Sequence, residues 1–442
     1  MEESFRQNTF FDRVTLCSDI NEIYNIPQEA FDSENIKRGL RNSDGTGVIA
    51  GVTRVGSVQG YTMVDGVPQA CEGRLFYRGI DMVDIIKKHA GAGTFGFEEV
   101  VYLLLLGRLP DEYQSRVFNE MLAQARKLPD GFVEDMIIKS PSPDIMNKIA
   151  RSVLALYSYD QHPNDTQPNN MVRQSVELIG RLPVLAAAAD AVRRRYYGGE
   201  SLILHVPQEG LSLAENLLHM LRRDNTFTRE EALLLDAMLI MHAEHGAGNN
   251  SAFTCRVIAS TGSDTYACIA AALGSLKGPL HGGANARVMA MFDDVKANVR
   301  DTSDDAMREY LRRIVAKEAF DRSGKIYGLG HAVYTLSDPR AIMLKKYAAH
   351  QAERTSMADD FALMERIERI GTEVLYEKLG DRKKICANVD MYSGLVYKML
   401  GFPEELFTPL FAIARIAGWC AHRIEEAMTG GRIIRPGYRA IG

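Results

Sequence analysis

Residues 241–283 read MHAEHGAGNNSAFTCRVIASTGSDTYACIAAALGSLKGPLHGG, a run of small and apolar residues divided by glycines and histidines. The apolar pattern before this stretch predicts a helix that opens at a capping box of Thr228 and Glu231, whose side chains satisfy free N–H groups of a first helical turn. Two glycines after the pattern predict the end of this helix. His242 and His245 lie three residues apart at that end, so the sequence places both on one helical face.

A second helix, rich in small residues, is predicted from about Ser263 to Lys277 and stops at Gly278 and Pro279. His281 follows in a tight loop, directly before another helical pattern. Because the positive end of a helix dipole disfavours an imidazolium, we expect a neutral His281 that donates a hydrogen bond to a carbonyl oxygen.

Helical patterns also fill most of the remaining chain. Residues 1–43 are expected to form an N-terminal helix or arm. Only Gly45–Ile80 alternates glycines with β-branched residues, which predicts a few short strands near the N-terminus. The predicted fold class is therefore all-α.

The composition is that of an ordinary globular protein. Its 442 residues suit more than one domain, and 46% of them are hydrophobic and 25% charged. A formal charge of −5 gives no field that recruits nucleic acid or a membrane. No apolar run reaches the length of a spanning helix, and we expect no secretory or transit peptide. The six cysteines lack CxxC spacing, which favours reduced thiols and a cytoplasmic location.

Four motifs resemble those of the citrate synthases and occur in that family's order: HAEHGAGNNSA from His242, GPLHGGAN from Gly278, GLGHAVYTLSDPRA from Gly328 and NVDMYSG from Asn388. The resemblance extends from VDG at Val64 to RIIRP near the C-terminus. It implies a citrate-synthase-like fold with a large helical domain, residues 1–282 and 388–442, and a smaller inserted helical domain, residues 283–387. A site between two such domains would open and close on substrate.

The resemblance implies an acyltransferase of the citrate (Si)-synthase type, in which the acyl group becomes an alkyl group on transfer. It would condense acetyl-CoA with oxaloacetate through an enol and hydrolyse citryl-CoA to citrate and coenzyme A, with no permanently bound cofactor. Such chemistry needs a base, a neutral donor for the thioester oxygen and a polariser for the ketone. These roles fall on Asp390, His281 and His331, respectively. Outside the motif, an aspartate in a first helical turn would be a cap, and each histidine a structural group.

His245 matches an oxaloacetate-binding histidine of the family, and His242 a neighbouring one. Their spacing would also suit a metal ion in a metal-dependent hydrolase, which is the alternative from another class. That alternative needs further ligands, yet no HExxH or CxxC accompanies the pair, and Glu244 is expected to point away from their common face. We therefore expect no metal site.

Three arginines match the family's carboxylate binders. Arg340 follows Asp338 and Pro339, which are predicted as the N-cap and first residue of a helix. Arg415 lies among apolar residues, where a cation needs either a protein carboxylate or a substrate carboxylate as partner. Arg435 would act across a subunit boundary, with Arg432 as the alternative.

Main-chain groups of the coenzyme loop, Ile326, Tyr327, Gly328, Leu329 and Gly330, would contact the adenine of the coenzyme. The chain departs from many relatives at Gly246, where they carry an acidic residue. It also has Thr335 where some carry an arginine for a coenzyme phosphate, and Lys325 is a substitute for that arginine.

Within the same chemistry, a 2-methylcitrate synthase would use propionyl-CoA instead of acetyl-CoA. One methylene changes a substrate preference by only about 1 to 3 kcal/mol, so the residues do not separate the two. The expected partners are oxaloacetate, acetyl-CoA and a second copy of the chain, because the small residues of CIAAALGS permit close helix contact.

Overall fold

The structure is a computed structural model that describes residues 25–32, 36–42, 46–64, 67–301, 303–380, 384–429 and 431–440. The chain divides into two compact units, Met1–Gly51 with Arg435–Gly442 and Val52–Ile434. In the first unit, α3 (Gln28–Asp32) and the 3-10 turn η1 (Arg38–Leu40) precede a bridge between Arg41 and Gly47. Residues 1–24, with most of the predicted N-terminal arm and Cys17, lie outside the described residues.

The second unit begins with the short strands that the sequence predicts. An antiparallel sheet has the order β1-β2-β3 and consists of β1 (Gly56–Val64), β2 (Val67–Tyr77) and β3 (Ile80–Asp81). Gly56 pairs with Tyr77 at the open end of the long hairpin, and Val64 pairs with Val67 at its closed end. The rest of the unit is mainly helical, which confirms the all-α prediction with a few short strands near the N-terminus.

The helices of this unit, in chain order, are α4 (Met82–Ala92), α5 (Phe97–Leu106), α6 (Glu112–Ala125), the π-turn η2 (Val133–Ile138), α7 (Ile145–Leu156), η3 (Tyr157–Tyr159), α8 (Pro168–Tyr197), α9 (Leu213–Leu221), α10 (Arg229–His242), α11 (Asn250–Ala259), α12 (Thr265–Lys277), α13 (Ala284–Asn298), α14 (Asp304–Val315), α15 (Pro339–Arg354), α16 (Ala358–Leu379), α17 (Asp390–Met399), η5 (Glu404–Leu406) and α18 (Phe407–Met428). None of these described helices is both long and apolar enough to cross a membrane.

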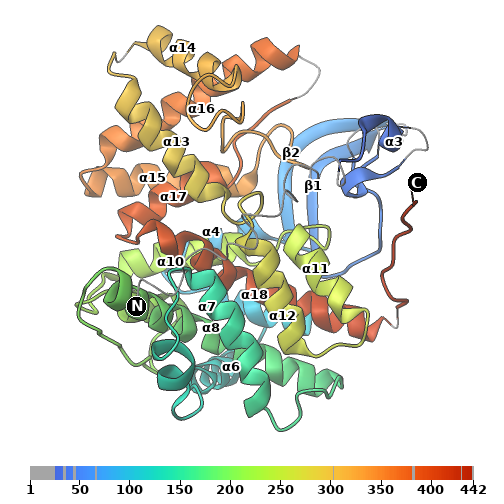
Figure 1. Ribbon diagram of the computed structural model, residues 1–442. Coiled ribbons are helices and arrows are strands. Elements are labelled where there is room, and N and C mark those ends of the chain that lie inside the picture. The colour runs from blue at the N-terminus through green and yellow to red at the C-terminus, as the bar shows by residue number, and fades with distance from the viewer. Residues whose placement is uncertain are drawn as a thin grey trace, which may run out of the picture. The chain divides into compact units, whose positions relative to one another are not determined.

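Helix α18 forms the centre of the core. It packs against α5, α8, α10, α11 and α12, and Figure 1 shows α18 among the labelled helices α7, α8 and α12. Trp419, the single tryptophan of the chain, is fully buried on it. Burial of such an apolar helix on several sides is a main source of stability, at about 25 cal/mol per Å² of apolar surface. Arg415 lies on this same helix, so the core itself fixes its place.

Helices α13 to α17 pack mainly on one another. Helix α14 contacts α16, while α13 and α15 both contact α17, and the group is visible at the upper left of Figure 1. The loops before α13 and α15 carry His281 and His331, and Asp390 is the first residue of α17. The division into large and small domains at residues 282 and 388 stays a prediction.

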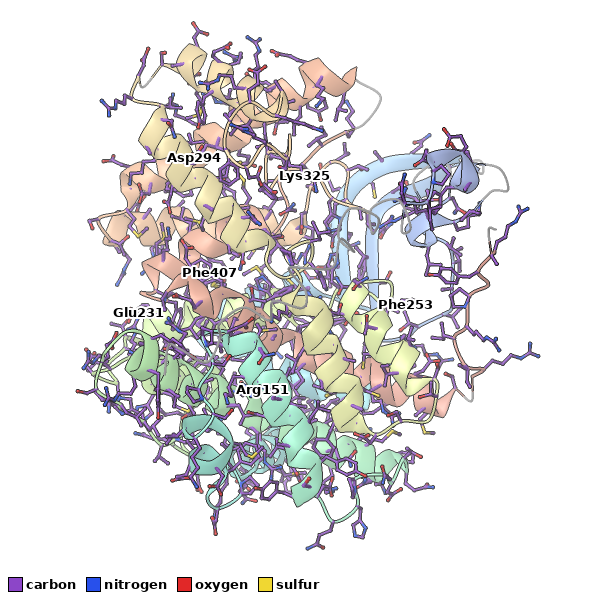
Figure 2. The ribbon with its side chains drawn as sticks, in the orientation of Figure 1. Arg151, Glu231, Phe253, Asp294, Lys325 and Phe407 are labelled. Carbon is purple, nitrogen blue, oxygen red and sulfur yellow. The ribbon has the colours of Figure 1, made fainter. Side chains whose placement is uncertain are left out.

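The ends of the helices agree closely with the sequence in most places. Thr228 caps α10 with Glu231, a residue labelled in Figure 2, and Asp338 and Pro339 begin α15 as predicted. Helix α12 begins at Thr265, because Asp264 accepts a hydrogen bond from the amide of Ala267 and acts as the N-cap. Helix α10, however, ends at His242, so the prediction that both histidines share a helical face is wrong.

Candidate active site

His242 is the last residue of α10, and its ring is fixed by its own helix. The Nδ1 atom donates to the carbonyl oxygen of Met238, 2.8 Å away, and the ring packs edge-on against Phe411 with 4.7 Å between ring centres. Burial lowers the pKa of His242 to about 3. His242 is therefore neutral, with its proton on Nδ1.

His245 lies in the loop that follows α10, next to two other aromatic rings. The centre of its ring is 5.1 Å from that of His331 and 5.5 Å from that of Tyr334. Burial lowers its pKa well below the usual value, as does the charge of Arg340. Its Nε2 atom is buried and has no hydrogen-bond partner within the described chain. Such an atom at a cluster of polar rings is suited to a ligand.

His331 is held by main-chain groups of its own loop. Its Nδ1 atom accepts hydrogen bonds from the amides of Val333 and Tyr334, both at 3.0 Å. Burial lowers the pKa of His331 to about 4, so the ring is neutral near pH 7 and its proton lies on Nε2. His331 is thus a neutral donor, as a residue that polarises a ketone must be.

The packing of the hairpin fixes the segment that follows His331. A side chain at Gly60 would overlap the carbonyl oxygen of Val333, and one at Gly73 would overlap that of Ser337. Thr335 donates to the carbonyl oxygen of Gly60 at 3.0 Å. The two glycines of the hairpin therefore let residues 333–337 lie directly on the sheet, and Thr335 is engaged there.

Arg340 forms a buried ion pair with the N-cap of its own helix. Its Nε and Nη2 atoms donate to the two carboxylate oxygens of Asp338 at 3.0 and 2.7 Å, and its guanidinium lies 5.8 Å from the ring centre of Tyr334. Burial opposes the charge, but Asp338 outweighs burial and raises the pKa of Arg340. The cation is therefore permanent and stands beside the histidine cluster.

Arg415 is 1% exposed and has only one hydrogen bond among the residues that the structure describes. Its Nε atom donates to the carbonyl oxygen of His242 at 2.6 Å, while the buried Nη1 and Nη2 atoms have no partner there. Burial lowers the pKa of Arg415 to about 10, which still leaves it charged at pH 7. Of the two partners that the sequence allows, a protein carboxylate makes no hydrogen bond or ion pair with Arg415 among the described residues. A planar fork with two free donors matches a ligand carboxylate.

His281 precedes α13, and its protonation is set by a residue that the sequence analysis did not single out. Its Nε2 atom accepts from the amide of Ser251 at 3.3 Å and lies 3.0 Å from the hydroxyl of the same residue. Burial lowers the pKa of His281 to about 4. A neutral ring that accepts at Nε2 carries its proton on Nδ1, so Nδ1–H is the donor that remains for a ligand.

Asp390 begins α17, and Asn388 ties it to the coenzyme loop. The side chain of Asn388 accepts from the amide of Asp390 at 3.0 Å and donates to the carbonyl oxygen of Gly330 at 2.9 Å. Leu329 and Ala387 form a β-bridge between the two segments. Burial raises the pKa of Asp390 to about 6, which makes it a stronger base than an exposed aspartate.

These predicted residues lie near one another. The charge of Arg415 alters the pKa of His242, His245, His281 and Asp390. The charge of Arg340 alters the pKa of His331 and Asp390. Coulomb interactions weaken with distance, so each arginine lies near the groups whose pKa it alters. The three catalytic candidates, both histidines of the pair and two arginines therefore form one cluster.

The coenzyme loop uses part of its backbone internally. The amide of Gly330 donates to Cys386, and the carbonyl oxygen of Gly328 accepts from Asn388. Gly328 and Gly330 have φ angles of 86° and 91°, and Ile326 is buried, while Leu329 and Tyr327 are half-buried. The hydroxyl of Tyr327 donates to Asp321 at 2.7 Å. Lys325, labelled in Figure 2, is exposed directly before this loop.

Arg435 belongs to the other compact unit, in an exposed extended segment, and Arg432 is exposed as well. Their proposed contact with substrate stays a prediction.

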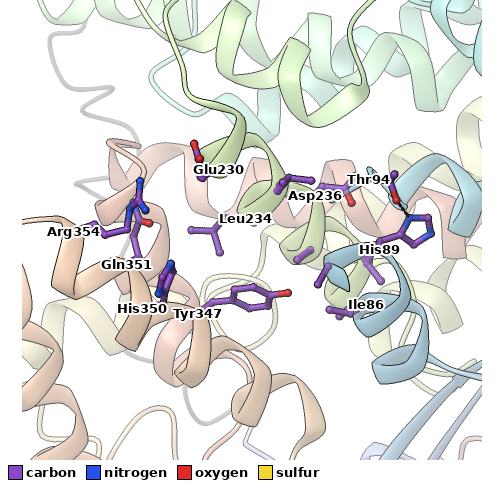
Figure 3. Close-up of a pocket in the computed structure, with 14 residues that line it drawn as sticks. Ile86, His89, Thr94, Glu230, Leu234, Asp236, Tyr347, His350, Gln351 and Arg354 are labelled. Atoms are coloured by element: carbon purple, nitrogen blue, oxygen red, sulfur yellow. Dashed lines mark hydrogen bonds between the residues drawn. The ribbon is translucent and has the colours of Figure 1, made fainter. Parts of the chain in front are cut away.

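A separate cavity of about 210 Å³ lies between α4, α10 and α15. Figure 3 shows the Tyr347 side chain reaching between Asp236 and Ile86, with His350 and Arg354 farther along the same helix. None of the predicted site residues lines this cavity. Within the described residues, no three His, Cys, Asp or Glu side chains gather as a metal ion would require.

The fold and the cluster together define a helical protein whose buried arginines and neutral histidines form a site suited to a small anion with a carbonyl group. Residues 44–437 match the family described as "Citrate synthase, C-terminal domain". The chain belongs to the citrate synthase family, and it is therefore an acyltransferase that needs no permanently bound cofactor.

Individual relatives agree with this assignment. The citrate synthase of Deinococcus radiodurans is 36% identical over 374 residues, which is 84% of this chain and 90% of the relative. A citrate/2-methylcitrate synthase of Bacillus subtilis is 33% identical and covers 84% and 90%. Among solved structures, the citrate synthase of Thermoplasma acidophilum in a ternary complex with carboxymethyl coenzyme A and oxaloacetate has a TM-score of 0.75 at 27% identity, covering 92% of this chain and 96% of that one. These matches give no support to the metal-dependent hydrolase hypothesis.

Proposed function

We propose that this enzyme condenses acetyl-CoA with oxaloacetate and hydrolyses the resulting citryl-CoA to citrate and coenzyme A. The observation that carries the proposal is the guanidinium of Arg415, which is buried and offers two donors with no protein partner in the described residues. Buried donors without a partner are costly unless a ligand accepts hydrogen bonds from them. One carboxylate of oxaloacetate is the proposed partner, with Arg340 and His245 beside it.

The proposed first step is removal of a proton from the acetyl methyl group by the carboxylate of Asp390. The thioester oxygen gains negative charge as the enol forms, and Nδ1–H of His281 donates to it. The amide of Ser251 keeps Nε2 of His281 unprotonated, so the ring is neutral. A neutral donor is what this task requires.

The proposed second step is attack of the enol carbon on the ketone of oxaloacetate. Nε2–H of His331 donates to the ketone oxygen and stabilises the charge that develops there. Water then cleaves the thioester of citryl-CoA, which releases coenzyme A and leaves a third carboxylate on the product.

The remaining parts of the proposal concern coenzyme binding and assembly. Main-chain groups of residues 326–330 that are not used internally would bind the adenine, and Lys325 would contact a phosphate. Arg435 would complete the site across a dimer boundary. We propose a homodimer in the cytoplasm whose small domain, residues 283–387, closes over the substrates.

A second candidate is condensation of propionyl-CoA, which would give 2-methylcitrate. One relative is named for both products, and this specific observation favours testing both. The test is release of free thiol with oxaloacetate and a panel of acyl-CoAs. We expect kcat/KM to be highest with acetyl-CoA. A higher value with propionyl-CoA would make the enzyme a 2-methylcitrate synthase, and no thiol release with any acyl-CoA would contradict the proposed condensation.

A further inference from the structure

Glu244 lies between His242 and His245 in the chain, and the proposed mechanism does not use it. Its side chain is completely buried. One carboxylate oxygen, Oε1, accepts from the amide of Gly246 at 2.5 Å and from Nε2 of His422 at 2.8 Å. The other oxygen, Oε2, is buried and has no hydrogen-bond partner in the part of the chain that the structure describes.

The protonation of His422 follows from its second neighbour. Its Nδ1 atom lies 3.2 Å from Nε and 2.8 Å from Nη2 of Arg256. A guanidinium donates only, so Nδ1 must accept, and the ring proton must lie on Nε2, which faces Glu244. Arg256 in turn donates to Glu426 at 2.7 Å and to Glu425. The three side chains Arg256, His422 and Glu244 are called the buried triad below.

Two glycines provide the space for the carboxylate. A Cβ atom at Gly56 of β1 would lie 2.8 Å from Cγ of Glu244, and one at Gly418 of α18 would overlap Oε2. The amide of Gly418 also donates to the carbonyl oxygen of Ala243 at 3.2 Å. The loop after α10 therefore packs directly on α18, with the side chain of Glu244 between them.

Arg415 donates to the carbonyl oxygen of His242, two residues before Glu244, at 2.6 Å, so its guanidinium lies beside the segment that carries Glu244. Glu244 and Arg415 stabilise each other's charge without direct contact. The structure describes no ion pair between them, yet Glu244 raises the pKa of Arg415 against the effect of burial. In return, His422 and Arg415 outweigh burial at Glu244 and lower the pKa of that carboxyl group. An anion at this place balances the arginine while its Nη1 and Nη2 atoms remain available.

We propose that Glu244, held in place by His422 and Arg256, is a positioning residue for the oxaloacetate side of the site. It fixes the loop that carries His245, and it balances the charge of Arg415 without occupying the donors that bind substrate. This inference rests on the proposed function. It assigns to the buried triad an effect on oxaloacetate binding, whereas the coenzyme loop, residues 326–330, makes no hydrogen bond to the triad within the described chain.

The main test replaces Glu244 by Gln, which keeps the size and removes the charge. We expect KM for oxaloacetate to rise about tenfold or more, which corresponds to about 1.4 kcal/mol, while kcat and KM for acetyl-CoA change less than about threefold. Calorimetric titration with oxaloacetate alone should give the same loss of affinity. An unchanged KM for oxaloacetate, or an equal loss in all three constants, would overturn the proposal.

A second pair of variants keeps the test valid if E244Q does not fold. His422→Phe removes both ring nitrogens, whereas His422→Gln keeps one donor and one acceptor. We expect H422F to raise KM for oxaloacetate and H422Q to restore it to within about threefold of the original value. If H422F and H422Q bind oxaloacetate equally well, the hydrogen bond to Glu244 has no positioning role.

The matched control is Glu99→Gln. Glu99 also accepts from a histidine, His89, at 3.3 Å, but this pair lies at the junction of α4 and α5. Within the described chain, its other side-chain hydrogen bonds go to Lys88 and Thr94, neither of which is a predicted site residue. We expect E99Q to change stability and to leave KM for oxaloacetate unaltered. Because all variants are compared with an active parent enzyme, failure of this inference is separate from failure of the proposed condensation.

Discussion

In three of the four histidines of the site, the hydrogen-bond partner of one ring nitrogen decides whether the other nitrogen donates or accepts. His281 and His331 each accept main-chain amides, at Nε2 and Nδ1 respectively, and so keep one N–H for a ligand. His242 instead donates to its own helix, so its free nitrogen is an acceptor. His281 and His331 are therefore neutral donors toward a ligand, whereas His242 is an acceptor.

Asp390 is the proposed base, and its removal should affect only one step. In Asp390→Asn the methyl proton has no acceptor, so we expect kcat to fall by about 10² to 10⁴ while oxaloacetate binding stays nearly unchanged. Exchange of the acetyl-CoA methyl protons with deuterated water, measured by NMR with oxaloacetate present, should be lost. Near-normal condensation by this variant would contradict the assignment.

The pH dependence of turnover follows from the same carboxyl group. The pKa of Asp390 is raised to about 6, and the active form is the carboxylate, so kcat should rise as the pH increases through about 6. His281 and His331, with pKa values near 4, stay neutral across this range. Assays at neutral pH after incubation in acid will separate this limb from unfolding. A limb centred below pH 5 would argue against Asp390.

Arg415 should determine affinity for oxaloacetate. Replacement by Leu removes the two free donors and the charge, so we expect KM for oxaloacetate to rise by about 30-fold or more, equivalent to about 2 kcal/mol. Arg415→Lys keeps the charge but loses the planar fork, and an intermediate value is expected. Unchanged affinity in R415L would show that the substrate carboxylate binds elsewhere.

At the scale of elements, the sequence predicts helices and caps better than loops. The caps at Thr228 and Asp338 follow from local hydrogen bonding, which a few neighbouring residues determine. The conformation after His242 does not, because Gly246 adopts a φ of 83° and α18 packs against the loop. The prediction that Glu244 points away from the two histidines used a helical geometry that does not extend beyond His242, and it gave no sign of the contact with His422.

Two other features, the contact of Ser251 with His281 and the packing of α12, could not be predicted from the sequence. Ser251 acts on His281 partly through its main-chain amide, which every residue except proline possesses. The stretch CIAAALGS, expected at a dimer contact, packs largely inside the chain, since α12 contacts α7, α11 and α18. Both features depend on contacts between segments far apart in the chain, and a local sequence pattern does not show such contacts.

The coenzyme loop depends on one glycine beside the proposed base. Gly328 has a φ of 86°, and a Cβ atom there would lie 2.6 Å from Sδ of Met391, the residue after Asp390. We expect Gly328→Ala to destabilise the protein by about 1 kcal/mol or more and to lower kcat. In Gly91→Ala the new methyl group meets nothing within 4 Å inside α4, so this control should be neutral or stabilising. Equal urea unfolding curves for both variants would refute the expectation.

At the scale of the whole molecule, the proposed homodimer is directly measurable. The chain has a mass of 49.2 kDa, so sedimentation equilibrium should give about twice that value. If Arg435 completes the site of a partner, mixing inactive R435A and D390N proteins under conditions of subunit exchange should restore part of the activity. A monomer with full activity would remove the role proposed for Arg435.

The glycines that accommodate Glu244 and the segment after His331 have a consequence for how this enzyme tolerates change. Gly56, Gly60, Gly73 and Gly418 carry no chemistry, yet any side chain there meets a site-supporting group or its backbone. In a library of random variants selected for growth, inactive clones would therefore accumulate at these four positions. Attempts to diversify the enzyme for new acyl donors would do better to leave them untouched.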